Sequence, residues 1–266
     1  TNKGYMLLNN NDILSSEGIS CYLDKKMDIY AYKTIDSTNT QMKKFAVDNH
    51  VNYALIVAEH QSAGRGRFNR NFYSPEKQGI YMSLLLRYDQ TFNDATLITI
   101  QSAVAIKRVI KKLYGIDTKI KWVNDLYYQS KKICGILTEA ISDFESGMIE
   151  AIIIGIGINV STKQFPEELL DKATSLGIEN INRSKFIALI VNEIFKIIDE
   201  DFDNVLNEYK DASCVLNKKV EFRYKGQIYN GIAKDINNLG NLIVKCDNQE
   251  YTLNSGEVSI IQKNYE

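Results

Sequence analysis

The sequence predicts an α+β protein, and three observations lead to this class. Stretches 118–128, 132–141 and 148–160 are rich in strand-forming residues, and only short polar turns separate them. Such turns favour an antiparallel meander, because parallel strands require long crossover connections. Apolar residues recur at helical spacing over 96–114, and after Ser213 the chain changes to short strand-like segments. We therefore expect helices that cover a sheet, followed by a small β-barrel.

The domain boundaries follow these changes in composition. We place a connector at residues 1–23, the large domain at 24–213 and the β-barrel domain at 214–266. The chain opens with Thr1 rather than methionine, and we expect further sequence upstream of it.

Helices and strands alternate in the first part of the large domain. Asp36-Ser37-Thr38-Asn39 is a cluster of helix-capping residues, and it opens a helix that runs to about Val47. A shorter capped helix is expected around 12–16. The strands expected before the meander are 27–35, 53–59 and 79–87.

A helix, a long loop and a second helix complete the large domain. The helix over 96–114 precedes the meander. Residues 161–182 contain Pro166, Gly177 and little periodicity, so we expect a loop, and loops of this length are often functional. Residues 183–210 carry one apolar stripe and predict a single helix. The strands expected in the barrel are 220–224, 227–233, 242–246 and 250–253.

The composition is that of a globular protein with little net charge. The chain has 266 residues, of which 44% are hydrophobic and 24% charged, and its net charge is -1. This balance gives no overall field that would draw it to DNA or to an anionic membrane. No apolar run approaches the roughly 20 residues that span a bilayer. The four cysteines form no C-x-x-C pair, which argues against a zinc site and suits buried, reduced thiols. We expect a cytoplasmic protein that does not contact a membrane.

The arginine loop, residues 64–70, is the strongest sign of a binding site. Three of the seven arginines, Arg65, Arg67 and Arg70, fall within six positions, with glycines between the first two and before them. Guanidinium groups pair with carboxylates and phosphates through two hydrogen bonds, and glycine lets the backbone approach a ligand closely. We expect this loop to bind an anion, and to repel itself and stay mobile until an anion orders it. Taken alone, such a cluster is more often a solvated or phosphate-binding surface than a catalytic loop.

Other polar groups stand at the ends of expected strands, where sites are commonly built. No P-loop sequence is present, and Gly155-Ile156-Gly157-Ile158-Asn159 lacks the third glycine and the following helix of a dinucleotide-binding fingerprint. A nucleotide, if bound, is held in another way. The polar strand ends are Lys121-Trp122-Val123-Asn124-Asp125, Lys131-Lys132 and Cys134-Gly135-Ile136-Leu137-Thr138-Glu139.

These residues also have purely structural interpretations. Ser37-Thr38-Asn39 is by default a helix cap, although spare hydroxyls of a cap can also face a ligand. Lys132 is by default a solvent-facing turn lysine. Gly155 and Gly157 could simply permit close contact within a strand, and for Trp122 we favour a place in the core.

Together the motifs resemble those of the biotin protein ligase family, whose members activate biotin with ATP and transfer it to a lysine of a carrier protein. The resemblance runs over nearly the whole chain, and the set of motifs is specific although each is weak alone. It rests on Ser37-Thr38-Asn39, Gln61 before the arginine loop, Lys121 to Asp125, Lys132 to Gly135, Gly155 to Asn159, Ala173-Thr174-Ser175-Leu176 and Gly256-Glu257.

The resemblance implies both a fold and a set of ligands. The fold is a mixed, mainly antiparallel sheet with helices, like the catalytic domain of class II aminoacyl-tRNA synthetases, followed by an SH3-like β-barrel. The ligands are ATP, Mg²⁺ and biotin, and the partner is a biotin carboxyl carrier protein of acetyl-CoA carboxylase or a similar enzyme.

The resemblance also implies roles for individual residues. Arg65, Arg67 and Lys132 would be catalytic, because they would surround the reacting carboxylate and phosphate. Asp125 would hold Mg²⁺. The residues implied for biotin are Ser37, Thr38, Asn39, Gln61, Arg65, Gly66, Arg67, Lys132 and Gly135. The residues implied for the nucleotide are Arg67, Arg70, Phe72, Asn124, Asp125 and Asn159.

The chain departs from the family pattern at two positions. Val123 stands where the family commonly has proline, and Phe72 stands where it has a tryptophan near the adenine. Phenylalanine can still stack on a base through a smaller face, so we expect a weaker hold on the adenine.

Three further possibilities follow from the resemblance. The alternative enzyme is a lipoate ligase or acyltransferase of the same fold, although its usual arginine pair followed by serine and glycines is absent here. Some family members are repressors with an N-terminal winged helix-turn-helix, and Lys3-Gly4-Tyr5-Met6-Leu7 resembles the last strand of its wing. Operator DNA is therefore expected as a partner only if such a domain precedes Thr1. Family members often form homodimers by placing sheets side by side, for which 148–160 is the candidate strand.

Overall fold

The computed structural model describes residues 12–87, 95–142, 149–247 and 249–261. Its helices are α1 (Ser16–Ser20), α2 (Thr38–Asp48), α3 (Ala95–Tyr114), α4 (Arg183–Ile198) and α5 (Phe202–Ala212). Its strands are β1 (Asp28–Ile35), β2 (Tyr53–Gln61), β3 (Gly79–Leu86), β4 (Lys119–Lys121), β5 (Asp125–Tyr128), β6 (Lys131–Ser142), β7 (Ile149–Asn159), β8 (Lys219–Tyr224), β9 (Gln227–Ile236), β10 (Leu242–Cys246), β11 (Gln249–Leu253) and β12 (Val258–Ile260).

Seven strands form the central sheet in the order β1-β2-β3-β7-β6-β5-β4. The β1–β2 pair is parallel, and the other neighbours are antiparallel. The parallel pair arises because α2 carries the chain back across the sheet between the two strands. This arrangement confirms the mixed, mainly antiparallel sheet and the α+β class.

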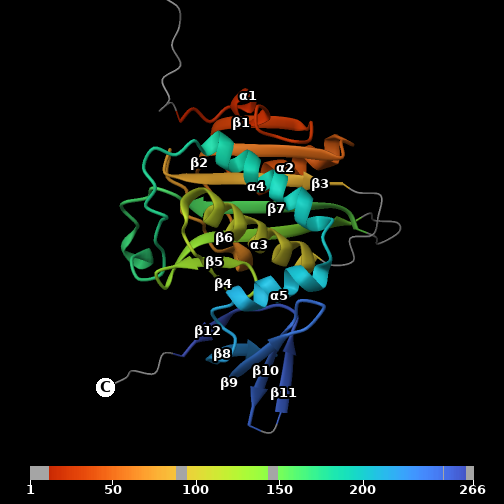
Figure 1. Cartoon of the computed structure of the whole chain (residues 1–266), viewed down its shortest axis with the longest axis vertical. Coiled ribbons are helices and arrows are strands. Elements are labelled where there is room, and N and C mark those ends of the chain that lie inside the picture. The colour runs from red at the N-terminus through yellow and green to blue at the C-terminus, as the bar shows by residue number, and fades with distance from the viewer. Residues whose placement is uncertain (1–11, 88–94, 143–148, 248, 262–266) are drawn as a thin grey trace, which may run out of the picture.

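Helices cover both faces of the sheet (Figure 1). On one face α3 and α4 lie across it, and their buried apolar side chains join those of the strands in the main core. On the other face α2 contacts β2, β3 and β7, where Met42 and Ala46 meet Ile56 and Ile153 in a smaller apolar cluster. The central strands β2, β3 and β7 are therefore buried on both sides, which leaves the ends of the strands and the gaps between helices for a site.

The C-terminal domain is a five-stranded antiparallel sheet in the order β11-β10-β9-β8-β12, which confirms the expected small β domain. It lies beyond α5 and β4 in Figure 1. One buried hydrogen bond joins the C-terminal domain to the large domain: the Trp122 indole N–H donates to the Gly240 carbonyl at 2.9 Å. A second fixes the neighbouring turn to α5, since the Tyr209 hydroxyl donates to the Val123 carbonyl at 2.9 Å. Trp122 is a core residue, as the sequence favoured.

Three expected elements were wrong in their extent. The first helix begins at Ser16, where we expected it to end, because Ser15 caps it. The strand expected over 118–128 is a hairpin of β4 and β5, since the chain turns at 122–124. The helix expected over 183–210 is two helices, because Asp201 accepts hydrogen bonds from the backbone N–H groups of Asp203 and Asn204 and so starts a new helix.

Two further expectations are corrected. The strand at 148–160 cannot be the pairing edge of a homodimer, because β7 is hydrogen-bonded to β3 on one side and to β6 on the other. Of the four cysteines only Cys134 is buried, and Cys21 is exposed. The wing-like segment at 3–7, residues 1–11 of the connector and residue 148 lie outside the described residues.

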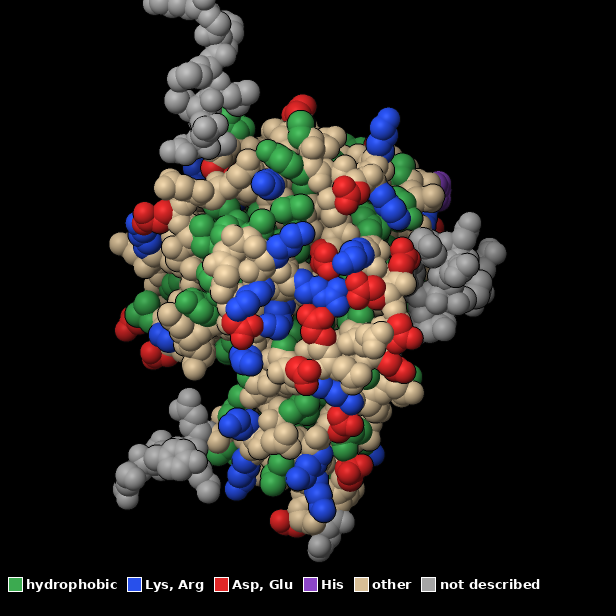
Figure 2. All heavy atoms as spheres, in the orientation of Figure 1, with side chains coloured by type: hydrophobic (Ala, Val, Ile, Leu, Met, Phe, Trp, Pro, Cys, Tyr) green, Lys and Arg blue, Asp and Glu red, His purple; other side chains and the backbone are tan. Residues whose placement is uncertain are grey.

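The charge distribution on the helical face is mixed. Figure 2 shows Lys and Arg interspersed with Asp and Glu across this face. The guanidinium of Arg108 on α3 bonds to Glu193 on α4, to Glu208 on α5 and to Glu200 between these two helices. No helix in the described ranges is long and apolar enough to cross a membrane.

Candidate active site

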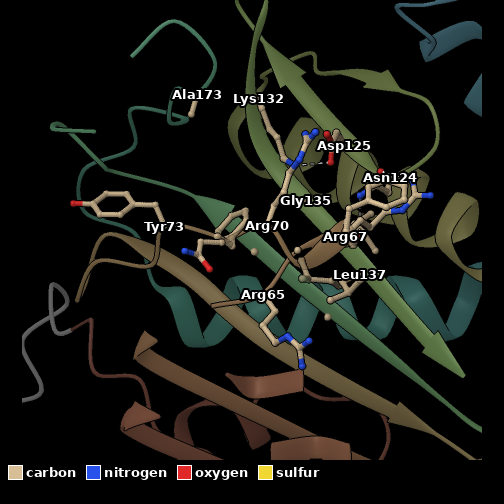
Figure 3. Close-up of a pocket in the computed structure, with 18 of the residues that line it drawn as sticks. Arg65, Arg67, Arg70, Tyr73, Asn124, Asp125, Lys132, Gly135, Leu137 and Ala173 are labelled. Carbon is tan, nitrogen blue, oxygen red and sulfur yellow. Dashed lines mark hydrogen bonds and ion pairs between the residues drawn. The ribbon is translucent and has the colours of Figure 1, made fainter. Parts of the chain in front are cut away.

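A cavity of about 720 Å³ opens at one end of the central sheet (Figure 3). Strands β2, β3, β5, β6 and β7 contribute to it, together with the start of α2, the arginine loop, the loop after β7 and the segment before β12. Every residue that the sequence and the resemblance singled out as a site residue lines this one cavity: Ser37, Thr38, Asn39, Gln61, Arg65, Gly66, Arg67, Arg70, Phe72, Asn124, Asp125, Lys132, Gly135 and Asn159. Their individual roles remain predictions.

The start of α2 forms a buried polar end of the cavity. Ser37 caps the helix, since its hydroxyl accepts from the Thr40 backbone N–H. Thr38 and Asn39 are each 4% exposed. Gln61, at the end of β2, accepts the Thr38 backbone N–H at 2.8 Å and donates to the Ser74 hydroxyl at 2.9 Å. The cap residues and Gln61 therefore form one connected polar lining, because both belong to the same junction between β1, α2 and β2.

Two glycines on β7 leave room for side chains that lie against this strand. A Cβ on Gly155 would stand 2.1 Å from Asn39 Oδ1, and a Cβ on Gly157 would stand 2.5 Å from the Phe72 ring. Only glycine lets these two side chains lie directly on the strand. The Phe72 ring consequently rests on the floor of the cavity, with its edge toward Tyr81 at a ring-centre distance of 6.4 Å.

The three arginines of the loop have three different partners. Arg65 donates to Asn69 Oδ1 at 3.2 Å, Arg67 donates to Asn124 Oδ1 at 3.2 Å, and Arg70 forms two bonds of 2.6 Å with Glu257. In Figure 3 the Arg65 side chain extends away from Lys132 and Asp125, on the opposite side of the drawn residues. The expected self-repulsion is thus relieved by separate neutral and acidic partners. Burial lowers the pKa of the Arg67 guanidinium, although the carboxylates of Asp125 and Glu257 oppose this effect.

Lys132 and Asp125 face each other across β5 and β6. Their Nζ and Oδ1 atoms are 2.7 Å apart, and the dashed line in Figure 3 marks this ion pair. The contact is an ion pair without hydrogen-bond alignment, because the buried Asp125 Oδ1 accepts no hydrogen bond within the described part of the chain. The same holds for Asn159 Oδ1, while Asn159 Nδ2 donates to the Thr174 carbonyl at 3.1 Å. Asn159 Oδ1 is therefore available to a ligand, and Asp125 Oδ1 becomes available when a ligand draws Lys132 away from it.

These oxygens fit the requirements of Mg²⁺ bound with a nucleotide. Mg²⁺ commonly takes one or two protein carboxylates and completes its shell with phosphate oxygens and waters. Asp125 supplies such a carboxylate. No group of three or more His, Cys, Asp or Glu side chains that could hold a metal by itself occurs among the described residues.

The sequence did not reveal several residues of the cavity. The segment 165–173 lines it through Phe165, Leu169, Lys172 and Ala173; the motif at 173–176 pointed to Ala173, and only the composition of the long loop pointed to the other three. Ser83 and Glu139 lie behind the lining and bond to it. Ser83 could have been noticed as a polar residue in the apolar strand 79–86, whereas Glu139 gave no signal beyond its place in a family motif.

Comparisons with known proteins agree with this geometry. Residues 31–159 match the Biotin/lipoate A/B protein ligase family, and residues 215–260 match the Biotin protein ligase C terminal domain. The chain is 38% identical over 179 residues to the Bifunctional ligase/repressor BirA of Bacillus subtilis, covering 65% of this chain and 54% of that protein. It is 27% identical over 266 residues to the protein of the same name from Escherichia coli, covering 97% of this chain and 81% of that one.

A solved structure supports the same assignment. The biotin protein ligase from Aquifex aeolicus in complex with biotin and ATP superposes with a TM-score of 0.74 at 26% identity, covering 89% of this chain and 99% of that one. The present chain thus spans about half of the Bacillus relative's length and most of the Aquifex enzyme. Its two domains match the two successive domains of one family in the same order, and the chain therefore belongs to the biotin protein ligase family.

Proposed function

We propose that the chain is an ATP-dependent biotin protein ligase. It activates biotin to biotinyl-5′-AMP with release of pyrophosphate, and then transfers biotin to a lysine of a biotin carboxyl carrier protein. The observation that carries the proposal is the single cavity, which holds a buried polar lining, the arginine loop and the Lys132–Asp125 pair together. These are the groups needed for the ring of biotin, for its carboxylate and for a nucleotide.

The chemistry explains why cations surround this cavity. The biotin carboxylate must attack the α-phosphate of ATP, so two anions have to approach each other. Arg67 and Lys132 reduce their repulsion and stabilise the charge that develops on the phosphoryl oxygens. Lys132 is held in place by Asp125 until substrates arrive. No nucleophilic side chain is required, because the carboxylate of the substrate is the nucleophile.

The second step moves the activated acyl group. The carrier lysine attacks the carbonyl carbon of the mixed anhydride, an amide bond forms, and AMP leaves with the electron pair of the broken C–O bond. Water must be kept from the same carbonyl. The arginine loop, which lines the cavity from Arg65 to Arg70, would close over the intermediate and exclude water from it.

Mg²⁺ belongs to the proposal as a companion of ATP. Asp125 would hold it together with nucleotide phosphates, and it would supply further neutralisation of phosphate charge. Asn159 offers its unpaired Oδ1 to the same region.

The polar lining favours biotin over lipoate as substrate. The buried Thr38 and Asn39 and the half-buried Gln61 present hydrogen-bonding groups to the cavity. The N–H groups of the biotin ureido ring can donate to the oxygens of this lining, whereas the dithiolane ring of lipoate has no N–H group to donate. A buried polar group that loses its partner costs about 1–3 kcal/mol, enough to discriminate between the two acids.

A repressor function is proposed only for a longer protein. Two relatives are named as ligase and repressor, but the chain covers 54% of the length of the Bacillus protein. Operator binding would require a DNA-binding domain before Thr1, and the mixed charge of the helical face offers no alternative surface for DNA on that side.

Biotin-dependent exchange of pyrophosphate into ATP tests the first step. We expect exchange with biotin and none with lipoate. Lys132→Met should slow exchange at least a hundredfold, while Lys163→Met, which alters an exposed lysine outside the cavity, should leave it unchanged. Exchange with lipoate and none with biotin would instead support the alternative function, that of a lipoate ligase.

A further inference from the structure

The side chain of Asn39 is fixed by partners on both sides of its amide. Its Nδ2 donates to Glu139 Oε2 at 2.9 Å and to the Leu137 carbonyl at 3.2 Å, while its Oδ1 accepts from the Ser83 hydroxyl. The amide lies on Gly155, which pairs with Ser83 on one side and with Leu137 on the other. An amide nitrogen has two N–H donors, and both are used.

The partners of Nδ2 determine which way the amide points. A carboxylate and a carbonyl oxygen only accept hydrogen bonds, so the nitrogen must face Glu139 and Leu137. The oxygen then has to face Ser83, whose hydroxyl is forced to donate to it. Glu139 also pairs with Lys43 at 2.6 Å, which holds the carboxylate beside α2.

The orientation of the Asn39 amide also determines how the Thr38 hydroxyl is hydrogen-bonded. The hydroxyl oxygens of Ser83 and Thr38 are 2.8 Å apart. Because the single proton of Ser83 goes to Asn39, Ser83 cannot also donate to Thr38, and the Thr38 proton goes to Ser83 or to Gln61 Oε1; in both arrangements it is used inside the lining. Gln61 Oε1 lies farther from the Thr38 hydroxyl, at 3.2 Å, and already accepts the Thr38 backbone N–H. The Thr38 oxygen is therefore left as an acceptor on the cavity side.

We infer that Glu139 is a positioning residue of the biotin site. Through Asn39, Ser83 and Thr38 it determines which groups of the site donate hydrogen bonds and which accept them. The site consequently accepts hydrogen bonds from the N–H groups of its ligand. The inference rests on the proposed function and deepens it, since it names the feature of biotin that the site selects. Glu139 does not line the cavity and acts only through its neighbours.

Biotin binding to single variants, measured by calorimetry, gives the first test. Glu139→Leu removes the acceptor and should raise the Kd for biotin at least fivefold, with the KM for ATP unchanged. Glu139→Gln keeps an acceptor oxygen and should stay within threefold of the unsubstituted chain. Glu150→Gln, in an ion pair with Arg87 elsewhere on the sheet, is the matched control and should have no effect.

A rescue experiment distinguishes positioning from a general structural role. Asn39→Asp places a second carboxylate against Glu139 and should weaken biotin binding at least a hundredfold. Adding Glu139→Gln to Asn39→Asp supplies an N–H donor to the new carboxylate at position 39. The double variant should therefore bind biotin at least tenfold more tightly than Asn39→Asp alone. Melting temperatures confirm that each variant is folded.

Three results would overturn the account. A Kd within twofold of the parent for folded Glu139→Leu, or no recovery in the double variant, would refute the role of Glu139 and leave the proposed ligase intact. If Glu139→Leu fails to fold, Ser83→Ala replaces it and should weaken biotin binding at least threefold, and an unchanged Kd there refutes the relay. Absence of biotin binding by the parent chain would refute the proposed function and the inference together.

Discussion

Arg70 of the arginine loop and Glu257 of the C-terminal domain form a bidentate ion pair, with both N–O distances at 2.6 Å. The pair joins the two domains over the mouth of the cavity, which both residues line. Its side chains are 64% and 47% exposed, so water screens the attraction. The pair raises the pKa of the Arg70 guanidinium, because that group donates hydrogen bonds to the Glu257 carboxylate.

Glu257→Gln should therefore have small effects. Exposed ion pairs contribute about 0–1 kcal/mol, so we expect the free energy of unfolding to change by less than about 0.5 kcal/mol and the KM for ATP by less than about fivefold. Denaturant unfolding and pyrophosphate exchange measure the two quantities. A change in KM beyond tenfold would show that the contact governs the nucleotide site.

Arg67→Ala should have a much larger effect than any change at Arg70. Arg67 is half-buried, lies within the cavity and donates to Asn124. Water therefore screens its charge less than it screens the charge of the exposed Arg70. Loss of one such group commonly slows a reaction about 10²–10³-fold. We expect adenylate formation to slow by at least a hundredfold, and Arg223→Ala, at an exposed position of β8, to be neutral. Equal rates for the two variants would remove Arg67 from the chemistry.

Gly155→Ala should damage the biotin end of the cavity selectively. The new methyl group would stand 2.1 Å from Asn39 Oδ1, and this amide cannot move without breaking its bonds to Glu139 and Ser83. Overpacking of this kind costs about 1–3 kcal/mol. The Kd for biotin should rise more than tenfold in calorimetry, and unaltered affinity would show that Asn39 is free to move.

Arg183→Leu should destabilise the fold. The Arg183 side chain is 1% exposed and pairs with Asp12 and with Glu59 on β2. Its removal leaves two carboxylates without their cation, and breaking such buried pairs costs about 3–5 kcal/mol. Urea unfolding should show a loss of this size, whereas Lys163→Met, which breaks an exposed pair, should leave the unfolding midpoint unchanged. A loss below 1 kcal/mol for Arg183→Leu would contradict the structure.

Arg108 should make stability sensitive to acid. Hydrogen bonds from Arg108 lower the pKa of the Glu200 carboxyl below its ordinary value of 4.5. A carboxyl with a depressed folded pKa stabilises the protein above its unfolded pKa, and this contribution is lost as the pH falls through the folded pKa. We expect stability to decline from about pH 5 downward, and Arg108→Met to flatten that decline. Thermal melts from pH 3 to pH 7 measure it, and parallel curves for both proteins would refute the prediction.

Local patterns predicted the elements but not all of their ends. Strand composition located β6 and β7, and the capping cluster at 36–39 located α2, because these signals lie within a few residues. The break between α4 and α5 was missed because the apolar stripe continues across it, while Asp201 alone starts the new helix. The parallel pairing of β1 with β2 was also missed, since strand order depends on contacts between distant segments.

The candidate site shows the same division. Short motifs placed the arginine loop, the cap and Lys132 in one cavity, because each motif keeps its own residues together. The hydrogen bonds that link Asn39 on α2 to Ser83 on β3 and to Glu139 on β6 join two separate strands and a helix. Such bonds follow from sheet register, in which Gly155 pairs with both Ser83 and Leu137, and no single segment of sequence contains that information.

The most direct test of the proposed function is the mass of a biotin carboxyl carrier domain after incubation with the chain, Mg-ATP and either biotin or lipoate. The account predicts a gain of one biotinyl group on a single carrier lysine, lost with Arg67→Ala, and no gain with lipoate. A lipoyl gain, or an unmodified carrier with both acids, would contradict it.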